Sequence, residues 1–179
     1  MKINSTLLLQ QLAAIARQDL QTAIALKDAD TATLYQRPAP GAWSAMQCLE
    51  HLNLYAAFYI PEIEKALSNG GSATPVFKSG LVGNMLVKMV QPKEHLKKMK
   101  TFQDMDPAGK ALPEDVLEKF IANQQRLLEL ISLAQTTNLN QRGVAVTFTS
   151  LIKLRQGDAL RFMVYHTQRH VQQAVRAAS

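Results

Sequence analysis

Three of the four histidines in this chain have the spacing expected of metal ligands. His166 and His170 lie four residues apart in the segment HTQRH, which places both imidazoles on one face of a helix, one turn apart. His51 lies far earlier, in WSAMQCLEHL, and would meet the pair if the two helices packed together. Three imidazole nitrogens leave one position of a tetrahedral ion open, which distinguishes catalytic from structural zinc sites. The sequence therefore predicts a divalent-metal site and does not select a reaction.

The faces of the two helices favour burial of these histidines. One side of the last helix carries Ala159, Met163, His166, His170 and Ala174, and the other carries Arg161, Tyr165, Gln168, Gln172 and Arg176. On the earlier helix, His51 shares a stripe with Cys48, Tyr55 and Phe58. A buried imidazole without a partner costs about 1–3 kcal/mol. A shared metal ion would remove that cost for all three.

Less specific interpretations remain open for these residues. A lone inward-facing histidine is more often a hydrogen-bonded core residue, and two histidines four apart occur by chance in many helices. Cys48 is on the same face as His51 and could be a fourth ligand, although a buried cysteine more often acts as a small apolar residue. Gln173 and Gln124 could each orient an imidazole or line a polar cavity. Tyr55 could donate to a substrate or pack in the core.

Length and composition favour one globular domain spanning residues 1–179. The chain has 179 residues, of which 47% are hydrophobic and 19% charged, as in ordinary soluble domains. Its single cysteine excludes an internal disulfide. No stretch approaches the roughly 18 apolar residues of a membrane span, and the early apolar run at residues 7–9 is too short for a signal peptide. We therefore expect a cytoplasmic protein without a membrane partner.

The formal charge of +6 raises the question of a nucleic-acid partner. The charge is densest in a segment that carries Lys93, Lys97, Lys98 and Lys100. Glu94 stands four residues before Lys98, an arrangement typical of a solvated helix face with an ion pair. His95 lies in the same segment and is expected at the surface. Because the chain has no nucleic-acid-binding motif and no interleaved aromatic platform, a solvated surface is favoured over a nucleic-acid groove.

Capping residues, prolines and glycines indicate where the long helices begin and end. The first helix is expected over residues 5–27, with its first residue, a serine, as the cap. The second is expected over residues 44–68, because Ser44 and Gln47 form a capping box and the segment NGG follows. Pro61 lies inside this second helix and predicts a kink or a local break.

The rest of the chain is expected to add two more long helices and an insertion. The connection over residues 71–112 should be partly helical, with one short helix between residues 80 and 90. The third helix should begin near Pro113. Residues 138–156 should be irregular, with GVAVTFTS extended and SLIKLR a helical turn, before Asp158 caps the last helix. The predicted fold is all-α, an antiparallel four-helix bundle with a partly helical insertion between its second and third helices.

Two segments together resemble a known family. The segments are WSAMQCLEHL and FMVYHTQRHVQQA, and the matching positions are Trp43, Ser44, His51, His166, His170 and Gln173. They resemble the DinB-like superfamily, which includes the YfiT-type metal-dependent hydrolases. The likeness covers essentially the whole chain in helix order. Each motif is weak alone, and their order and distances make the combination fairly specific.

The resemblance implies a four-helix bundle, often a homodimer, that holds a divalent metal ion on His51, His166 and His170. Zinc and nickel are the ions most associated with such sites, although histidine nitrogens without thiolates also suit iron, cobalt or manganese. The resemblance gives no substrate. Some members are transferases or isomerases that depend on a low-molecular-weight thiol, bacillithiol or mycothiol.

Two functions are consistent with these expectations. In the first, the protein is an enzyme for a small molecule, and the open metal position binds water for hydrolysis or a thiol for S-transfer. The sequence offers no general base, which favours thiol transfer and leaves the catalytic residues unknown. In the second, the protein is a non-catalytic bundle, stabilised by metal or dimerisation, that binds a partner or a small ligand. A nucleic-acid role ranks third.

Overall fold

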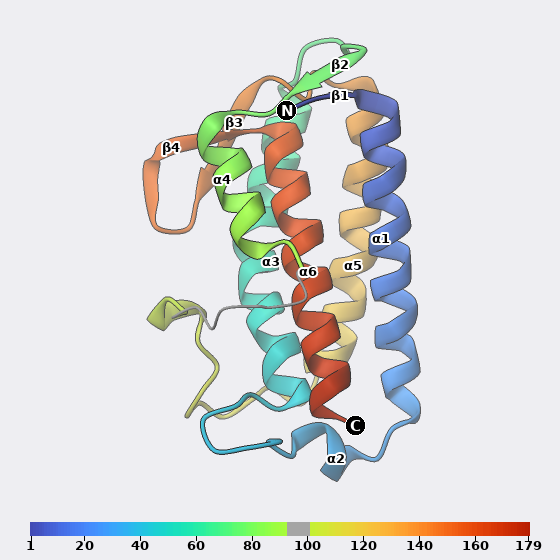
Figure 1. The fold of residues 1–179 in the computed structure, drawn as a ribbon, viewed down its shortest axis with the longest axis vertical. Helices are drawn as coiled ribbons and strands as arrows, with labels where there is room; N and C mark the ends of the chain where they lie inside the picture. Colours follow the sequence, from blue (N-terminus) through green and yellow to red (C-terminus); the bar gives the residue numbers. More distant parts are fainter. Residues whose placement is uncertain (93–100) are drawn as a thin grey trace.

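Four long helices form the body of the molecule (Figure 1). The computed structural model describes residues 1–92 and 101–179. Helices α1, α3, α5 and α6 span Ser5–Ala25, Ala45–Ser68, Val116–Leu133 and Gln156–Ala177. α1 and α6 run in one direction and α3 and α5 in the other, so α3 packs antiparallel to α6 and α1 antiparallel to α5. The predicted all-α bundle is confirmed, and the long connection from α3 to α5 allows these two neighbours to run parallel.

Shorter elements lie at the ends and on one side of the bundle. Two short helices, α2 and α4, span Thr31–Tyr35 and Leu81–Val90. Three 3-10 turns, η1, η2 and η3, span Leu26–Asp28, Gln103–Met105 and Ala134–Thr136. Two antiparallel pairs of strands are β1 (Lys2–Asn4) with β2 (Val76–Lys78) and β3 (Arg142–Val146) with β4 (Thr149–Arg155). The short helix predicted inside the insertion is therefore confirmed as α4.

Helix α3, which carries His51, begins as predicted. The backbone N–H of Gln47 donates to Ser44 Oγ at 3.2 Å, and the N–H of Ser44 donates to Gln47 Oε1 at 3.1 Å. This capping box satisfies two backbone donors that a helix start would otherwise leave free. The helix is continuous through Pro61, so it has no local break there.

Helix α1 begins at Ser5 as predicted but with a different cap, and α5 begins later than predicted. Ser5 is not the cap of α1, because the preceding Asn4 is extended and its side chain accepts the N–H of Leu7 at 3.0 Å. α5 begins at Val116 rather than near Pro113, because the intervening residues form a turn. That turn brings the chain onto α3, where Val116 is buried.

Asp158 lies inside the first turn of α6 and is not its cap. The helix begins at Gln156, whose N–H donates to the carbonyl of Gln141 at 2.9 Å. The next N–H, that of Gly157, donates to the carbonyl of Leu139 at 3.0 Å. The chain upstream of β3 thus supplies acceptors for the free donors of this helix start, and no side-chain cap is needed.

The segment SLIKLR, expected as a helical turn, is part of strand β4. It pairs antiparallel with β3, with Val144 opposite Leu154 and Ala145 opposite Lys153. Val144 and Leu154 are fully buried, and β3 packs against α3. The prediction was wrong because the extended conformation of this segment depends on its pairing with β3 and on the helix beneath that pair. A local pattern of apolar and polar residues does not show these partners. The expected extended piece is confirmed as β3.

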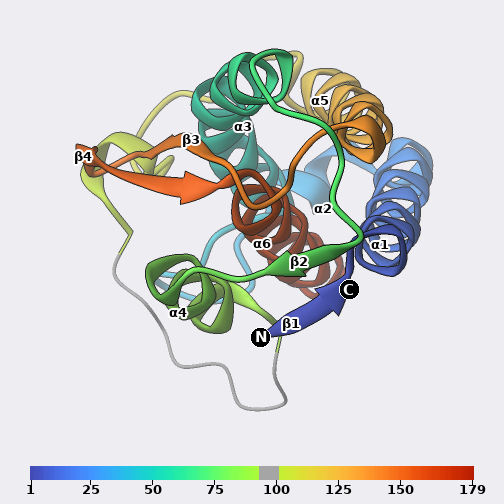
Figure 2. The ribbon, with the colours of Figure 1, turned by 90° about the horizontal axis from the view of Figure 1, so that it is seen from above.

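The histidines lie between two apolar clusters of the core. The upper cluster includes Tyr55, Tyr59 and Met163, and the lower cluster includes Cys48, Leu49 and Val171. Between them, α3 and α6 contribute buried polar side chains, namely His51, Asn53, His166 and Thr167. Figure 2 shows α6 near the middle of the bundle, with α1, α3, α4 and α5 around it. The packing of α3 against α6 therefore positions this polar layer.

Helix α4 covers the side of α6 that carries Arg161. Arg161 is buried, and its Nη1 pairs with Asp158 Oδ1 at 3.1 Å. The Asp158 carboxylate also accepts from Ser79 Oγ and from the N–H of Gly80, the residue that begins α4. A Cβ at Gly83 would lie only 2.4 Å from Asp158 Cγ. The helix pattern alone gave no indication that Arg161 is buried, because it does not show which side the insertion covers.

Two expectations lie partly or wholly outside the described structure. The lysine-rich segment, with His95 and the expected pairing of Glu94 with Lys98, falls in residues 93–100, outside the described residues. Among the described helices, none combines the length and the apolar character needed to cross a membrane.

Candidate metal centre

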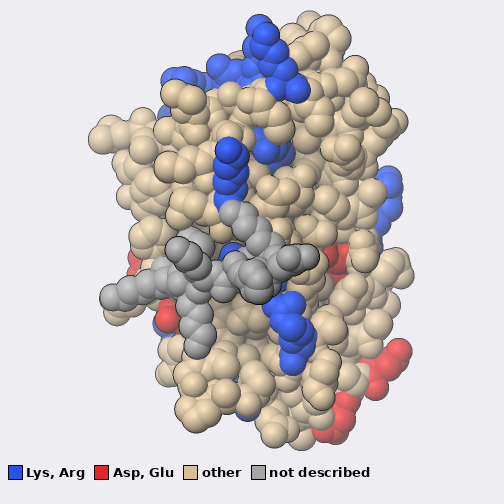
Figure 3. All heavy atoms as spheres, viewed as in Figure 1, with Lys and Arg blue, Asp and Glu red and all other residues tan. Residues whose placement is uncertain are grey.

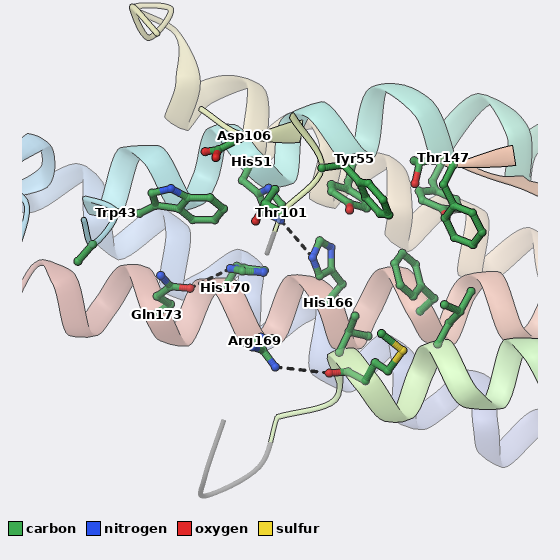
Figure 4. A pocket seen from close by; sticks show the side chains of 18 of the residues that line it. Trp43, His51, Tyr55, Thr101, Asp106, Thr147, His166, Arg169, His170 and Gln173 are labelled. Atoms are coloured by element: carbon green, nitrogen blue, oxygen red, sulfur yellow. Dashed lines mark hydrogen bonds between the residues drawn. The ribbon is translucent and has the colours of Figure 1, made fainter. Parts of the chain in front are cut away.

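Antiparallel packing of α3 and α6 brings the three predicted histidines together (Figure 4). One ring nitrogen from each of His51, His166 and His170 lies within 4.8 Å of the others. The ring centroid of His51 lies 5.0 Å from that of His166 and 4.6 Å from that of His170. His51 and His166 are buried and His170 is partly buried. The described residues thus contain a compact cluster of nitrogen ligands that could hold a metal ion.

Neighbouring oxygen atoms fix the orientation of two of these imidazoles. His51 Nδ1 donates to the backbone carbonyl of Met105 at 2.7 Å. His170 Nδ1 donates to Gln173 Oε1 at 3.0 Å. Since both partners are acceptors, each Nδ1 carries the proton and each Nε2 keeps its lone pair. A second hydrogen bond of this kind is typical of metal-binding histidines.

The ring nitrogens of His166 are not both satisfied by the described residues, so this histidine needs a further group beside it. Its Nε2 lies 3.2 Å from His51 Nε2, and its buried Nδ1 has no hydrogen-bond partner among the described residues. If Nδ1 carries the proton, two lone pairs face each other; if Nε2 carries it, a buried lone pair has no donor. Two nitrogens bound tetrahedrally to one zinc ion at about 2.0–2.1 Å are about 3.3 Å apart. The spacing of the two Nε2 atoms therefore fits a shared ion.

Burial keeps the three imidazoles neutral. It lowers the pKa of His51 to about 4, against opposing effects of a backbone carbonyl and of Asp106. It lowers the pKa of His170 to about 3, and the charges of His51 and Arg169 act in the same direction. The pKa of His166 lies well below its usual range, first through burial and then through the neighbouring histidines. Neutral imidazole is the form that binds metal.

The structure separates the alternatives left open by the sequence for the neighbouring residues. Cys48 lies in the lower apolar cluster, outside the group of ligand atoms, and burial raises the pKa of its thiol to about 12. Gln173 accepts a hydrogen bond from His170 and so orients an imidazole, which was one of the two roles predicted for it. Gln124 is buried, but its Oε1 has no hydrogen-bond partner in the described structure, so it orients no histidine through that atom. Tyr55 lies on the cavity wall.

The histidines face a cavity of about 570 Å³ (Figure 4). That volume falls in the usual range for sites that bind small molecules. Helix α3 contributes Tyr55 and Tyr59 to the wall, and helix α4 contributes Leu86, Met89 and Val90. Helix α6 contributes Phe162, His166, Arg169, His170, Gln173 and Arg176. The cluster is therefore accessible to a molecule larger than water.

Several residues of the site were not identified from the sequence. Met105 holds His51 through its carbonyl, and Asp106 lines the cavity beside it. Thr147 lines the cavity from the turn between β3 and β4, and Arg169 lines it from α6. The first three lie in the connections between the long elements, so no helix-face pattern along the chain pointed to them. Arg169 stands next to His170, and its place in the helix was the one available indication.

Comparison with known proteins gives one match, to a family model that covers most of the chain. No curated protein and no solved structure matches the chain. The family model described as the DinB superfamily matches residues 13–174, a span that contains all three histidines and the four long helices except the two ends. The chain belongs to the DinB superfamily.

Proposed function

We propose that this protein is a metal-dependent enzyme that acts on a small molecule in the cavity. In this proposal His51, His166 and His170 bind one divalent ion, zinc or nickel. The observation that carries it is the convergence of three neutral imidazoles, two of them oriented through Nδ1, on a cavity of about 570 Å³. Membership of the DinB superfamily supports it.

The proposed reaction is thiol-dependent S-transfer or hydrolysis. A bound divalent ion would supply Lewis acidity, which acidifies a thiol or a water beside it and so makes a nucleophile at neutral pH. Met105 and Gln173 hold two of the ligand rings in place. Tyr55, Tyr59 and Phe162 exclude water from one side of the cavity and give it an apolar wall.

Asp106 provides a way to separate the two reactions. It is the acidic side chain among the described residues that line the cavity, and its charge acts on His51. Hydrolysis needs a group that accepts a proton from water, whereas an acidified thiol does not. Asp106→Asn should therefore abolish hydrolysis but leave thiol transfer within a few-fold of the parent rate, measured with a panel of electrophiles and esters.

Metal content tests the proposal directly. Elemental analysis of protein purified without an affinity tag or chelator should find near one divalent ion per chain. His51→Ala and His166→Ala should each lose it, whereas His95→Ala, which removes the remaining histidine, should retain it. Folded protein that binds neither zinc nor nickel would overturn the ligand assignment.

The second function, a non-catalytic bundle, predicts a different result for the same kind of variant. Loss of His170 in an enzyme should abolish turnover and leave the helical content unchanged. In a metal-stabilised binding protein, His170→Ala should lower the melting temperature, with no activity to lose. Circular dichroism together with activity screening of the two proteins distinguishes these outcomes.

A further inference from the structure

Large apolar side chains lie exposed at the mouth of the cavity. Met89 of α4, Phe102 just before η2 and Phe148 in the turn between β3 and β4 all line the cavity. They are nevertheless 45, 55 and 47% exposed. The rings of Phe102 and Phe148 are stacked, with their centroids 5.9 Å apart. Exposed apolar side chains gathered around a cavity are typical of a site where a ligand covers them.

One end of the cavity is lined by apolar and aromatic side chains from three helices. We call it the apolar arm, and the residues that form it are Tyr55, Tyr59, Leu86, Val90 and Phe162. The ring centroids of Tyr55 and Tyr59 lie 6.2 and 5.2 Å from that of Phe162. The rings of Tyr55 and Phe162 also approach His166, with centroids 4.5 and 5.4 Å from its own. The arm therefore ends at the histidine cluster (Figure 4).

The apolar arm offers little to a charged or strongly polar group. The hydroxyl groups of Tyr55 and Tyr59 both hydrogen-bond with Thr147, so their polar tips are already engaged. Burial raises the pKa of Tyr59 to about 12, which indicates surroundings that disfavour a charge. The charged residues of the described cavity wall lie beside the histidines or beyond them along α6, namely Asp106, Arg169 and Arg176. A ligand group that occupies the arm is therefore neutral.

The aromatic rings of the site favour an aromatic ligand over an alkyl one. Among the described residues, three aromatic side chains line the arm and two more lie at the mouth. An aromatic ring that packs edge-to-face or offset against another gains a factor of about 3–10 in affinity beyond the apolar area that it buries. The thioether of Met89 at the mouth makes favourable contacts of its own with ring edges. A saturated ring of the same size would gain neither.

We propose that the apolar arm binds the aromatic body of a neutral substrate. The body enters past Phe102 and Phe148, fills the arm, and leaves the reacting group of the substrate beside His166. The proposal names the substrate class for the proposed function, and it rests on that function only in assigning the reaction to the histidines. Binding of the aromatic body itself requires no metal ion, because every contact in the arm is made by the side chains of α3, α4 and α6.

The test compares two neutral alcohols, phenylbutanol and cyclohexylbutanol, which share a chain and a hydroxyl group and differ in the ring. Each is titrated against bound N-phenylnaphthylamine, a neutral aromatic dye that fluoresces in apolar sites. Basic side chains follow one another down the middle of the face that carries α4 (Figure 3). They would attract an anion without any specific site, so charged ligands are avoided. Titrations use the protein as purified, with its metal content measured, and the same protein after treatment with a chelator.

Phenylbutanol should bind about 3–10-fold more tightly than cyclohexylbutanol, with and without the chelator. Leu86→Trp, which fills the arm, should weaken phenylbutanol binding about tenfold or more. Met85→Trp is the matched control and should keep the affinity, because Met85 is exposed on the same helix and does not line the cavity. Leu86→Ala enlarges the arm, and it should improve the binding of naphthylbutanol relative to phenylbutanol about threefold or more.

Three results would overturn the inference. Cyclohexylbutanol that binds as tightly as phenylbutanol, or more tightly, would show an apolar cavity without aromatic recognition. Equal effects of Leu86→Trp and Met85→Trp would place the ligand outside the arm. Loss of phenylbutanol binding with the chelator would place it on the metal.

Failure of the proposed function gives a different pattern. Protein that takes up no metal and has no turnover, yet prefers the phenyl ring and loses it in Leu86→Trp, would refute the proposed enzyme and support the aromatic site. Turnover of electrophiles or esters that Leu86→Trp leaves unchanged would support the enzyme and refute the aromatic site.

Discussion

At His170, the amide oxygen of Gln173 determines which ring nitrogen carries the proton. The hydrogen bond from His170 Nδ1 leaves Nε2 directed at the other histidines. Loss of such a partner usually costs 10–100-fold in metal affinity. Gln173→Ala should therefore weaken zinc binding about 10–100-fold, measured by competition with a chromophoric chelator. Gln172→Ala changes the exposed neighbour and should have no effect. Equal affinities in both variants would show that Gln173 does not position the ligand.

The lowered pKa values of the histidines predict weak competition between protons and metal. The pKa is about 4 for His51 and about 3 for His170, so both rings stay neutral as the pH falls to 5.5. Zinc affinity should then change by less than about threefold between pH 7.5 and 5.5. Three histidines with an ordinary pKa of about 6.5 would lose roughly a thousandfold over the same interval. Competition titrations at the two pH values distinguish these outcomes.

Asp19 predicts a different pH dependence, that of stability. It is buried on α1, its Oδ2 has no hydrogen-bond partner in the described structure, and burial raises its pKa from the ordinary 3.8 to about 7. Between these pH values the folded protein holds a proton that the unfolded chain has released. The stability that the folded protein gains by binding this proton is therefore full below pH 4 and is lost as the pH rises to 7.

Asp19→Asn should remove the fall in stability that ionisation of Asp19 causes between pH 4 and pH 7. Its free energy of unfolding, relative to the parent protein, should rise by up to about 4 kcal/mol between pH 4 and pH 7. Asp28→Asn, at an exposed position, is the control and should follow the parent protein. The measurement is urea unfolding at a series of pH values. A constant difference between Asp19→Asn and parent would show that this carboxyl titrates normally.

At the scale of elements, the contact between α4 and α6 shapes the cavity. α4 supplies part of the cavity wall, and it approaches α6 closely where Gly83 meets Asp158. The Asp158 carboxylate is held by Ser79, Gly80 and Arg161, so it has little freedom to move. A side chain at position 83 must therefore push the two helices apart.

Gly83→Ala tests this packing. In an open helix position, alanine would stabilise the protein by up to about 1 kcal/mol relative to glycine. Here the added Cβ would lie 2.4 Å from Asp158 Cγ, so we expect a loss of about 1–3 kcal/mol in the free energy of unfolding. Gly71→Ala is the control, because its Cβ would make only an ordinary contact of 3.7 Å. Chemical denaturation gives both values, and a stabilised Gly83→Ala would contradict the close packing.

For the whole molecule, the histidines form part of a polar layer between two apolar clusters. An ion that binds only the folded state stabilises it by about 2.7 kcal/mol at a hundred times its Kd. For a domain of this size that corresponds to a rise in Tm of about 5–11 °C. Thermal unfolding with zinc and with chelator should show this difference in the parent protein. The same difference in His166→Ala would place the metal elsewhere.

Local patterns in the sequence were enough to predict much of the bundle and the cluster of three histidines. The capping box of Ser44 and Gln47 and the spacing of His166 and His170 depend on residues within one or two helical turns. A helix start and the face of a helix are determined by such near neighbours. The sequence by itself therefore determined that the three histidines point inward, and the expected cluster followed once α3 and α6 packed together.

The tertiary structure decided what surrounds those residues. Asp158 does not cap α6 because backbone carbonyls from the chain before β3 accept its first N–H groups. Arg161 is buried because α4 covers it, and strand β4 forms because β3 pairs with it. His51 is held by the carbonyl of Met105, 54 residues away along the chain. Strands β3 and β4 are neighbours along the chain, but the other interactions join segments distant in sequence, and the sequence carries no local pattern for a partner that only the packing of the helices brings near.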